Sequence, residues 1–462
     1  MLDITLIRDN PNVVKDSLEK RNDDPQLVDQ ILGLDQRRRD ILQEVEELRR
    51  QRNESSKQIG RWIGNLKKLE ADLKRAEAGQ DVGQSLDQMR TQVNALQANA
   101  DEAKDQTRAI GEQISNLDEE LRQVEGDLND KMLWLPNLIH DSVPLGPDES
   151  HNIAHEPAGA PIPTFDFDPI PHWDLGPALD IIDFEQGVKL SGSRFYVLKG
   201  AGARLQRALI QFMLNYHLDE HGYTEIYPPF MVRSAVFEAA GQLPKFYDNI
   251  YRDAEEDFMW LGTAEIALTN IHRDDVLEEA DLPLKYVAYT PCFRREKMSA
   301  GRDVRGIKRG HQFDKVEMYH FTHPDHSFAA LEALRQHAIA ICDALNLPYR
   351  LVELCSGDVG FVMTKTYDIE VWAAGCQEWL EVSSISNALE FQARRANVKF
   401  RPADGGKLQY PHTLNASGLA LPRVMIAILE NNQQADGSIV VPEVLRPYMG
   451  GTAVIGPVEK RV

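Results

Sequence analysis

Residues 290–317 read TPCFRREKMSAGRDVRGIKRGHQFDKVE and form the most informative stretch of the chain. Two β-rich runs flank a basic loop punctuated by glycines, and they carry cationic, aromatic and acidic side chains: Arg294, Glu296, Phe313, Lys315 and Glu317. The pattern predicts a hairpin that presents these groups on one floor beneath a cationic loop. Such groups suit an adenine nucleotide, with a ring face for the base, an arginine for phosphate and carboxylates for an amine. Taken alone, the stretch also fits a basic surface hairpin.

The size and charge of the chain limit what it can be. At 462 residues it is too long for one ordinary domain, and its 42% hydrophobic content is enough for a substantial core. The formal net charge of −21 argues against a general nucleic-acid coat, because binding a polyanion requires local lysines and arginines. Any nucleic-acid surface must therefore be a patch. The acidic surface fits either solubility or life at high salt.

The cysteines and the N-terminus indicate a cytosolic protein with neither a zinc site nor disulfides. Four cysteines are scattered without a CxxC pair, which predicts buried free thiols and neither a disulfide framework nor a zinc site: Cys292, Cys342, Cys355 and Cys376. The opening MLDITLIRDNP lacks the basic start and apolar core of a signal peptide. No apolar run reaches the roughly 18 residues that a membrane span needs. We expect a cytoplasmic protein without a membrane partner.

Two long helices are predicted first. Apolar residues step by three and four from Leu27 to about residue 77, with polar interruptions at Arg52 and Ser55, and again from about 85 to 132. Heptads sustained over so many turns are typical of a coiled coil. The short linker between them contains two glycines, so the arms should fold back as an antiparallel hairpin, each arm roughly 75 Å long at 1.5 Å per residue.

The two predicted arms differ in charge. Residues 37–75 carry 12 Lys and Arg against 7 Asp and Glu, whereas residues 76–130 carry 4 against 13. A basic arm in so acidic a protein predicts an RNA-backbone surface, and its length favours recognition of RNA shape. The alternative is that these charges only solvate the hairpin and pair with the acidic arm. The candidate RNA contacts are Arg49, Arg50, Arg52, Lys57, Arg61, Lys67, Lys68, Lys74 and Arg75.

The remainder of the chain predicts a linker and a catalytic domain of class α+β. Residues 136–177 are rich in Pro, Gly, His and Asp and cannot hold a long helix. A helical pattern over 202–222 precedes YTEIYPPFMV, and short β-rich runs then alternate with a few helices. Because no GxGxxG or GxxxxGK[ST] occurs, a nucleotide site would have to use side chains on an antiparallel sheet flanked by helices. The predicted domains are 1–134, with arms over about 27–77 and 85–132, a linker over 135–177 and a catalytic domain over 178–462.

The 290–317 stretch resembles motif 2 of class II aminoacyl-tRNA synthetases, and its HQFDKVE ending is similar to the version in seryl-tRNA synthetases. YTEIYPPFMV with its preceding helix resembles motif 1, which implies a homodimer. TLNASGLALPR (413–423) resembles motif 3. Seryl-tRNA synthetases of the common type also carry an N-terminal antiparallel hairpin that grips the long variable arm of their tRNA, so the resemblance covers both parts of the chain.

The resemblance implies an amino-acid pocket. The TAE triplet at 263–265 is similar to the loop that covers the amino acid, although a helix N-cap with an acidic first turn is the alternative. In the family, Thr263, Glu265 and Glu317 would contact the serine ammonium group, Arg294 the carboxylate, and Asn415 and Ser417 the hydroxyl. The expected serine-binding residues are Thr263, Ala264, Glu265, Arg294, Glu317, Asn415 and Ser417.

The resemblance also implies an ATP site with Mg²⁺ or Mn²⁺ and no zinc. Arg294 would hold the α-phosphate and Arg423 the γ-phosphate, and these two are the expected catalytic residues. Glu381 and Ser384 would ligate the metal on the ATP phosphates, but residues three apart on a strand face opposite sides, so a bend is needed. The expected ATP-binding residues are Arg294, Arg295, Glu296, Gly310, Phe313, Glu381, Val382, Ser383, Ser384 and Arg423.

The implied activity is ATP-dependent attachment of L-serine to tRNA(Ser) through seryl-adenylate, and charging of tRNA(Sec) stays open. The loop reads EKMSAGRD where relatives more often have EAGSxGRD, which leaves the roles of Lys297 and Met298 open. Three alternatives remain. They are a threonyl- or prolyl-type synthetase, a truncated homologue that loads carrier proteins, and a coiled-coil adaptor without enzymatic activity.

Overall fold

The computed structural model describes residues 1–297 and 305–457, and it divides into two compact units. One unit comprises Gln26–Met132, and the other combines Met1–Pro25 with Leu133–Val462. Within the described residues, no helix is long and apolar enough to cross a membrane. The two units are described separately.

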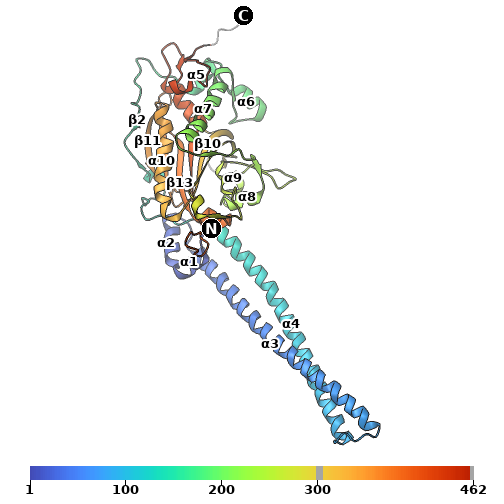
Figure 1. The fold of residues 1–462 in the computed structure, drawn as a ribbon. Coiled ribbons are helices and arrows are strands. Elements are labelled where there is room, and N and C mark those ends of the chain that lie inside the picture. The colour runs from blue at the N-terminus through green and yellow to red at the C-terminus, as the bar shows by residue number, and fades with distance from the viewer. Residues whose placement is uncertain (298–304, 458–462) are drawn as a thin grey trace. The chain divides into compact units, whose positions relative to one another are not determined.

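The first unit is the predicted antiparallel hairpin. It consists of α3 (Gln26–Glu77) and α4 (Leu86–Trp134), whose bounds lie within two residues of the predicted arms. Figure 1 shows the two helices running side by side from one end to the other. An apolar seam joins them through Ile41, Val45, Ile114 and Val124. Deletion of either helix would leave this seam exposed, so the arms stabilise each other.

Polar contacts reinforce the hairpin. The predicted interruption at Ser55 lies opposite Thr107, and their hydroxyl oxygens are 2.9 Å apart. A satisfied polar pair inside an apolar seam favours one register over others. Ion pairs also cross between the arms, including Arg37 with Glu120 at 2.7 Å.

The first 25 residues cluster with the larger unit rather than with the hairpin. They form α1 (Ile4–Asp9) and α2 (Pro11–Lys20). The Arg21 guanidinium donates to the carbonyls of Asn137 at 2.8 Å and Val359 at 2.9 Å, and Asp3 pairs with Arg394 at 2.9 Å. These contacts join the short helices to the larger unit.

The larger unit is built on a nine-stranded sheet, mostly antiparallel, as the sequence predicts. The strands follow the order β1-β11-β12-β13-β15-β10-β9-β5, with β2 beside β11, and only β5 pairs in parallel, with β9. Their bounds are β1 Ile153–Ala154, β2 Ala158–Gly159, β5 Thr224–Glu225, β9 Leu284–Phe293, β10 Gln312–Thr322, β11 Pro348–Glu353, β12 Lys365–Ala373, β13 Glu378–Leu389 and β15 His412–Ala420.

Helices and short two-stranded ribbons complete this unit. The helices are α5 His172–Ala178, α6 Phe184–Ser191, α7 Gly200–Asp219, α8 Ser234–Ala239, α9 Glu265–Thr269, α10 Ser327–Ala344, α11 Phe391–Arg395 and α12 Leu421–Asn431. The ribbon strands are β3 Ile182–Asp183, β4 Val197–Leu198, β6 Met231–Val232, β7 Met259–Trp260, β8 Val276–Glu278, β14 Lys399–Arg401, β16 Ile439–Val440 and β17 Val454–Ile455. The predicted linker over 135–177 contains only a 3₁₀ turn, β1, β2 and the start of α5.

Strand β10 shows how the sheet separates core from site. Val316 and Met318 join the main apolar core, to which α7, α10 and α12 also contribute. Alternate residues of a strand face opposite sides, so Glu317 and Tyr319 lie on the other face. Tyr319 packs there in a second apolar cluster. Figure 1 shows α10 lying along the strands near β13. The four cysteines are free thiols, and Cys376 is the one that is only half-buried.

Candidate active site

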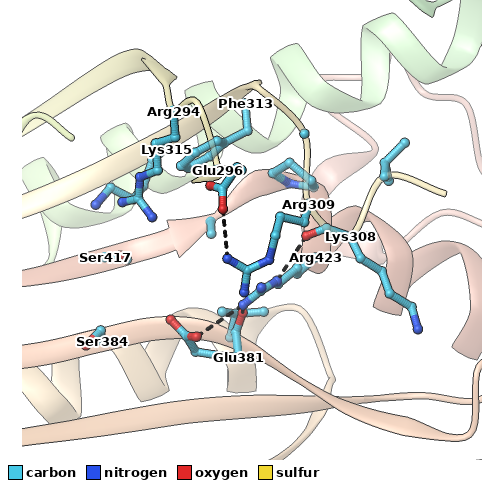
Figure 2. A pocket seen from close by; sticks show the side chains of 15 residues that line it. Arg294, Glu296, Lys308, Arg309, Phe313, Lys315, Glu381, Ser384, Ser417 and Arg423 are labelled. Carbon is cyan, nitrogen blue, oxygen red and sulfur yellow. Dashed lines mark hydrogen bonds and ion pairs between the residues drawn. The ribbon is translucent and has the colours of Figure 1, made fainter. Parts of the chain in front are cut away.

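The predicted hairpin is present as β9 and β10. They pair antiparallel with Gln312 opposite Phe293, so Phe313, Lys315 and Glu317 share one face of the sheet. Figure 2 shows Arg294, Phe313 and Lys315 grouped on this floor above the strand that carries Glu381 and Ser384. Two adjoining cavities open over the floor, and both are bordered by Arg294, Lys315 and Ser417.

The first cavity, called here the cationic cavity, has a volume of about 170 Å³. Five cationic side chains and one aromatic ring line it, together with Glu296 and Glu381. The cationic and aromatic residues are Arg294, Lys308, Arg309, Lys315, Arg423 and Phe313. Several fixed cations beside a ring are the groups that a polyphosphate attached to an aromatic base requires. Gly310 and Val382 also border this cavity.

The arginines of the cationic cavity are held by neighbouring groups. Arg423 Nη1 donates to the carbonyl of Glu381 at 2.8 Å and to its carboxylate at 3.2 Å, while Nε donates to the carbonyl of Lys308 at 3.3 Å. Arg309 Nη1 donates to the Glu296 carboxylate at 3.0 Å. Figure 2 shows these guanidinium groups pointing into the same space. Pre-oriented cations of this kind can stabilise charge without rearrangement.

Arg294 and Glu296 occupy defined conformations at the end of β9. The Arg294 guanidinium lies 5.1 Å from the centre of the Phe313 ring, and its Nε donates to the Gly262 carbonyl at 3.1 Å. Glu296 is buried and has a φ of +52°. For a residue other than glycine this left-handed conformation costs about 1 kcal/mol, a strain often found at functional sites.

The second cavity, called here the carboxylate cavity, has a volume of about 480 Å³. Glu265 and Glu317 lie in it on neighbouring elements. The buried Glu317 carboxylate accepts from Thr263 Oγ1 at 2.6 Å and from Asn415 Nδ2 at 3.2 Å, and it pairs with Lys315. The same amide lies 3.4 Å from Glu265 Oε2. Two carboxylates beside hydroxyl and amide groups can bind an ammonium group next to a hydroxyl.

The environment of Glu265 perturbs its ionisation. Burial raises the pKa of this carboxyl group to about 7, and the nearby Glu317 carboxylate adds to the effect, while Lys315 opposes it. Gln392 Nε2 donates to Glu265 Oε1 at 2.6 Å, which also favours the ionised form. A cationic ligand beside Glu265 would lower this pKa and favour the ionised carboxylate.

The expected bend between Glu381 and Ser384 is a β-bulge. Strand β13 pairs with β12 so that Ser383 faces Ile369 while Glu381 faces Glu370, leaving Val382 as the extra residue. The insertion shifts the alternation, and Glu381 and Ser384 consequently line the same two cavities.

Asp368 is a site residue that the sequence did not reveal. It lies directly opposite Ser384 and lines the carboxylate cavity. Its buried Oδ1 has no hydrogen-bond partner among the described residues. Burial, followed by the Glu381 carboxylate, raises the pKa of Asp368 well above its usual value.

Within the described part of the chain, some expected site residues border neither cavity. Ala264 is fully buried at the start of α9, and the Ser383 hydroxyl donates to the Ser417 carbonyl at 2.6 Å. Arg295 is held through its backbone N–H, which donates to the Asn249 carbonyl at 3.0 Å. Lys297 is exposed, and Met298 lies outside the described residues.

The TAE triplet lies at the start of a helix and at the border of the carboxylate cavity. Helix α9 begins at Glu265, whose N–H lies 3.4 Å from Thr263 Oγ1. The same hydroxyl also bonds to Glu317, and both side chains line the carboxylate cavity. The helix start therefore places these side chains in the site.

The basic candidates of α3 divide into residues that form ion pairs and residues that do not. Arg49 pairs with Asp118 of the acidic arm at 3.2 Å, Arg50 pairs with Glu47 and Glu54, and Arg75 pairs with Asp72. Within the described part of the chain, the other six candidates have no ion-pair partner: Arg52, Lys57, Arg61, Lys67, Lys68 and Lys74. Exposed ion pairs are worth little, so the paired arginines can still exchange partners for phosphate.

Comparisons with known proteins cover both units. Residues 1–103 match the family described as seryl-tRNA synthetase N-terminal domain, and residues 247–432 match tRNA synthetase class II core domain (G, H, P, S and T). Serine--tRNA ligase of Roseiflexus sp. (strain RS-1) is 56% identical over 455 residues, which cover 98% of this chain and 99% of the relative. The ligase of Chloroflexus aurantiacus (strain ATCC 29366 / DSM 635 / J-10-fl) is 51% identical, with 99% of this chain and 100% of the relative covered.

Solved structures give the same result. The seryl-tRNA synthetase from Pyrococcus horikoshii complexed with ATP superposes with a TM-score of 0.86 at 37% identity, covering 99% of this chain and 100% of that one. The cytoplasmic serine-tRNA ligase from Naegleria fowleri in complex with AMP gives a TM-score of 0.82 at 29% identity, covering 99% of each chain.

Proposed function

The chain belongs to the seryl-tRNA synthetase family, and we propose that it attaches L-serine to tRNA(Ser) in two steps through seryl-adenylate. The observation that carries this proposal is the meeting of the two cavities at Arg294. A ligand ammonium group held by Glu265 and Glu317 would place its carboxylate beside a phosphate held by the cationic cavity. Both cavities border Arg294, so one guanidinium can contact the two reacting groups.

Recognition of serine follows from the groups in the carboxylate cavity. Glu265, Glu317 and Thr263 would bind the ammonium group. Asn415 Oδ1 is buried and has no hydrogen-bond partner among the described residues, so it can accept from the serine hydroxyl, with Ser417 beside it. Alanine as a competing substrate would leave this oxygen unpaired, which can reduce activity by several orders of magnitude. Threonine as a competing substrate must be excluded by size.

Activation needs no side-chain nucleophile. A serine carboxylate oxygen would attack the α-phosphorus of ATP in line, forming a C–O–P linkage as the bond to the pyrophosphate oxygen breaks. Arg294 would orient the carboxylate and α-phosphate, and Arg423 would hold the γ-phosphate. Phe313 would stack on the base, and Glu296 would accept from its amino group. Catalysis would come from positioning and fixed charge.

The residues present fit a hard cation on the ATP phosphates. The β-bulge brings Glu381 and Ser384 to the same cavities, and the unpartnered Asp368 oxygen lies nearby. Oxygen ligands of this type prefer Mg²⁺ or Mn²⁺. When bound, the metal would neutralise phosphate charge. Glu381 would hold it while also accepting from Arg423, which couples the two groups.

In the second step, the terminal ribose hydroxyl of the tRNA would attack the activated carbonyl and release AMP. The hairpin would hold the tRNA through the basic side chains of α3. An arm that reads RNA shape would accept tRNAs of the same shape, so the proposal includes tRNA(Sec). With these substrates, the proposed site of action is the cytoplasm.

We also propose a homodimer, built by α7 and the segment after β5. The large side chains of Tyr227 and Met231, beside Pro228 and Pro229, are exposed in the single chain. An apolar surface of this kind is suited to burial by a second copy.

Amino-acid-dependent exchange of pyrophosphate into ATP tests the activity. All twenty amino acids would be assayed in parallel, and we expect exchange with serine alone. Exchange with another amino acid would contradict the pocket assignment while keeping the fold. Absence of exchange with any would contradict the activation step. Charging of tRNA(Ser) and tRNA(Sec) transcripts, with a tRNA that lacks a long variable arm as control, then tests the RNA partners.

Serine binding is expected to strengthen as the pH rises from 6 to 8. Glu265 has a pKa of about 7 in the ligand-free protein, so at pH 6 it is mostly protonated and must lose its proton to pair with an ammonium group. A single group with this pKa predicts a roughly tenfold decrease in Kd across the range. Calorimetric titration with serine in two buffers of different ionisation enthalpy measures both the Kd and the released proton.

The matched variant is Glu265→Gln. It should bind serine more weakly, with a flat pH profile and no buffer-dependent proton release. An unchanged pH dependence in this variant would assign the titration to another group.

A further inference from the structure

His172 lies outside the residues that resemble the family motifs, yet it contacts the loop that lines the cationic cavity. We infer that His172 is a positioning residue for ATP: it fixes residues 305–309, called here the loop root, and thereby Arg423. The inference rests on the proposed function, because it assumes that the cationic cavity binds ATP.

The imidazole of His172 is held in one tautomer. The side chain is fully buried at the start of α5, and Nδ1 lies 2.7 Å from Oε1 of Glu430, near the end of α12. The backbone N–H of His172 donates to the same oxygen at 2.8 Å, and the N–H of Cys376 donates to Oε2 at 2.8 Å. A carboxylate accepts, so Nδ1 carries the proton and Nε2 is left as an acceptor.

That acceptor bonds to the loop root. The backbone N–H of Ile307 donates to His172 Nε2 at 3.1 Å, in a buried position. Gly306 has a φ of +71°, and a Cβ atom there would lie 1.9 Å from Nε2. The imidazole therefore packs directly against the loop backbone, and a side chain at residue 306 would displace one of them.

The neighbouring Trp173 holds the charged side chains on both sides of this contact. The Arg305 guanidinium lies 4.4 Å from the centre of the indole ring, and Lys308 Nζ lies 5.4 Å from it. Cations at such distances from an indole ring are attracted to its face, which orients both side chains. Two adjacent residues of α5 thus hold four consecutive residues of the loop.

The loop root leads directly into the cationic cavity. Ile307, Lys308 and Arg309 line it, and the Lys308 carbonyl accepts from Arg423 Nε. Arg309 in turn bonds to Glu296. A shift of the backbone at Ile307 would therefore move the carbonyl that orients Arg423 and the base of the Arg309 side chain. The carboxylate cavity contains none of these three loop residues among its lining residues in the described structure.

A metal centre is the competing role for this cluster. Ligand atoms of His172, Cys376 and Glu430 lie within 4.8 Å of one another. However, the protein already supplies hydrogen-bond partners, since the Cys376 thiol donates to Glu430 Oε1 at 3.1 Å and Nε2 accepts from Ile307. Fully paired groups need no ion, so the geometry favours positioning.

Two substitutions separate the contacts of the imidazole. Asparagine can present an N–H where Nδ1 lies, so His172→Asn keeps the bond to Glu430 and loses the bond to Ile307. Glutamine can present an oxygen where Nε2 lies, so His172→Gln restores the acceptor for Ile307. For His172→Asn we expect a KM for ATP about tenfold higher in serine-dependent exchange, a KM for serine within twofold of wild type, and a protein that remains folded at the assay temperature. His172→Gln should recover most of the ATP effect.

Gly306→Ala provides an independent test through a double-mutant cycle. Alone, it should also raise the KM for ATP, because its Cβ collides with Nε2. In the His172→Asn background the colliding atom is gone, so the same change should add less than its effect in wild type. Additive effects would overturn the contact as the cause.

Other outcomes would also overturn the inference. A wild-type KM for ATP in His172→Asn would do so, as would equal losses for ATP and serine with a fallen Tm, which would indicate a merely structural role. One bound metal per chain that His172→Asn loses would assign the cluster to an ion. Calorimetry with a non-hydrolysable ATP analogue measures the nucleotide effect without serine. Absence of exchange in the wild type would contradict the proposed function, while the calorimetric comparison of wild type and His172→Asn would still decide the role of His172.

Discussion

Replacing Arg423 with alanine is expected to reduce serine-dependent pyrophosphate exchange about 10³-fold while the protein remains folded. Removing one preorganised donor to developing charge typically costs 10²–10³ in rate, and a guanidinium on a transferring phosphoryl group can cost more. Arg423 lies in the first turn of α12 and is held by carbonyl groups of Glu381 and Lys308. Its guanidinium is therefore oriented before ATP binds. Substitution by alanine removes both the positive charge and the fixed N–H donors.

Two further variants make the Arg423 result specific. Arg423→Lys keeps the charge but loses the planar fork, so it should recover only part of the rate. Arg401→Ala removes an exposed guanidinium that pairs with Glu278 at 3.7 Å, away from both cavities, and should leave exchange unchanged. Circular dichroism and gel filtration would establish that each variant is folded. Near wild-type exchange in Arg423→Ala would contradict the assignment of motif 3.

Periodicity made the large elements predictable. The heptads located both arms within two residues, because the apolar seam through Ile41 and Ile114 imposes that repeat on the sequence. The alternation along β10 likewise predicted a shared floor for Phe313, Lys315 and Glu317. No local pattern predicts that residues 1–25 cluster with the larger unit, because Arg21 and Asp3 bond to segments that are distant in sequence.

The parts of the site that sequence reasoning missed depend on long-range pairing. Asp368 faces Ser384 only because β12 pairs with β13, and His172 reaches Ile307 across more than a hundred residues. The sequence analysis required a bend between Glu381 and Ser384 but could not assign it to Val382, because a β-bulge has no residue pattern of its own. Arg309 and Lys308 were visible as part of a basic loop, but only the fold shows that they face the cationic cavity rather than solvent.

Shortening the hairpin is expected to abolish tRNA charging while sparing adenylate formation. A deletion of residues 49–114, closed by a short Gly-Ser turn, removes all nine basic candidates of α3. It retains Ile41 and Val124 of the seam and the ion pairs of Arg37 with Glu120 and Arg38 with Glu125. The two cavities are lined by residues of the other unit alone, so serine-dependent exchange should stay within about twofold of wild type. Charging should fall about 10³-fold in kcat/KM for tRNA, since phosphate contacts supply much of RNA affinity.

A full-length variant with fewer positive charges separates the effect of the arm's length on tRNA binding from the effect of its charge. Replacing Lys57, Lys67, Lys68 and Lys74 with glutamine removes cations that lack ion-pair partners among the described residues. Each lost phosphate contact should lower the salt dependence of tRNA binding by about 0.7–0.9 in log–log slope. The matched control replaces Lys104 and Arg108 of α4, which pair with Asp101 and Asp105, and should leave the slope unchanged.

The two measurements together decide what the hairpin does. Weak charging by the deletion with a wild-type slope in the lysine variant would assign recognition to the shape of the arm rather than to these lysines. Equal loss of slope in the lysine variant and the α4 control would indicate a general charge effect. Normal charging by the deletion would contradict the RNA-binding role, because no other long element in the described chain offers such a basic surface.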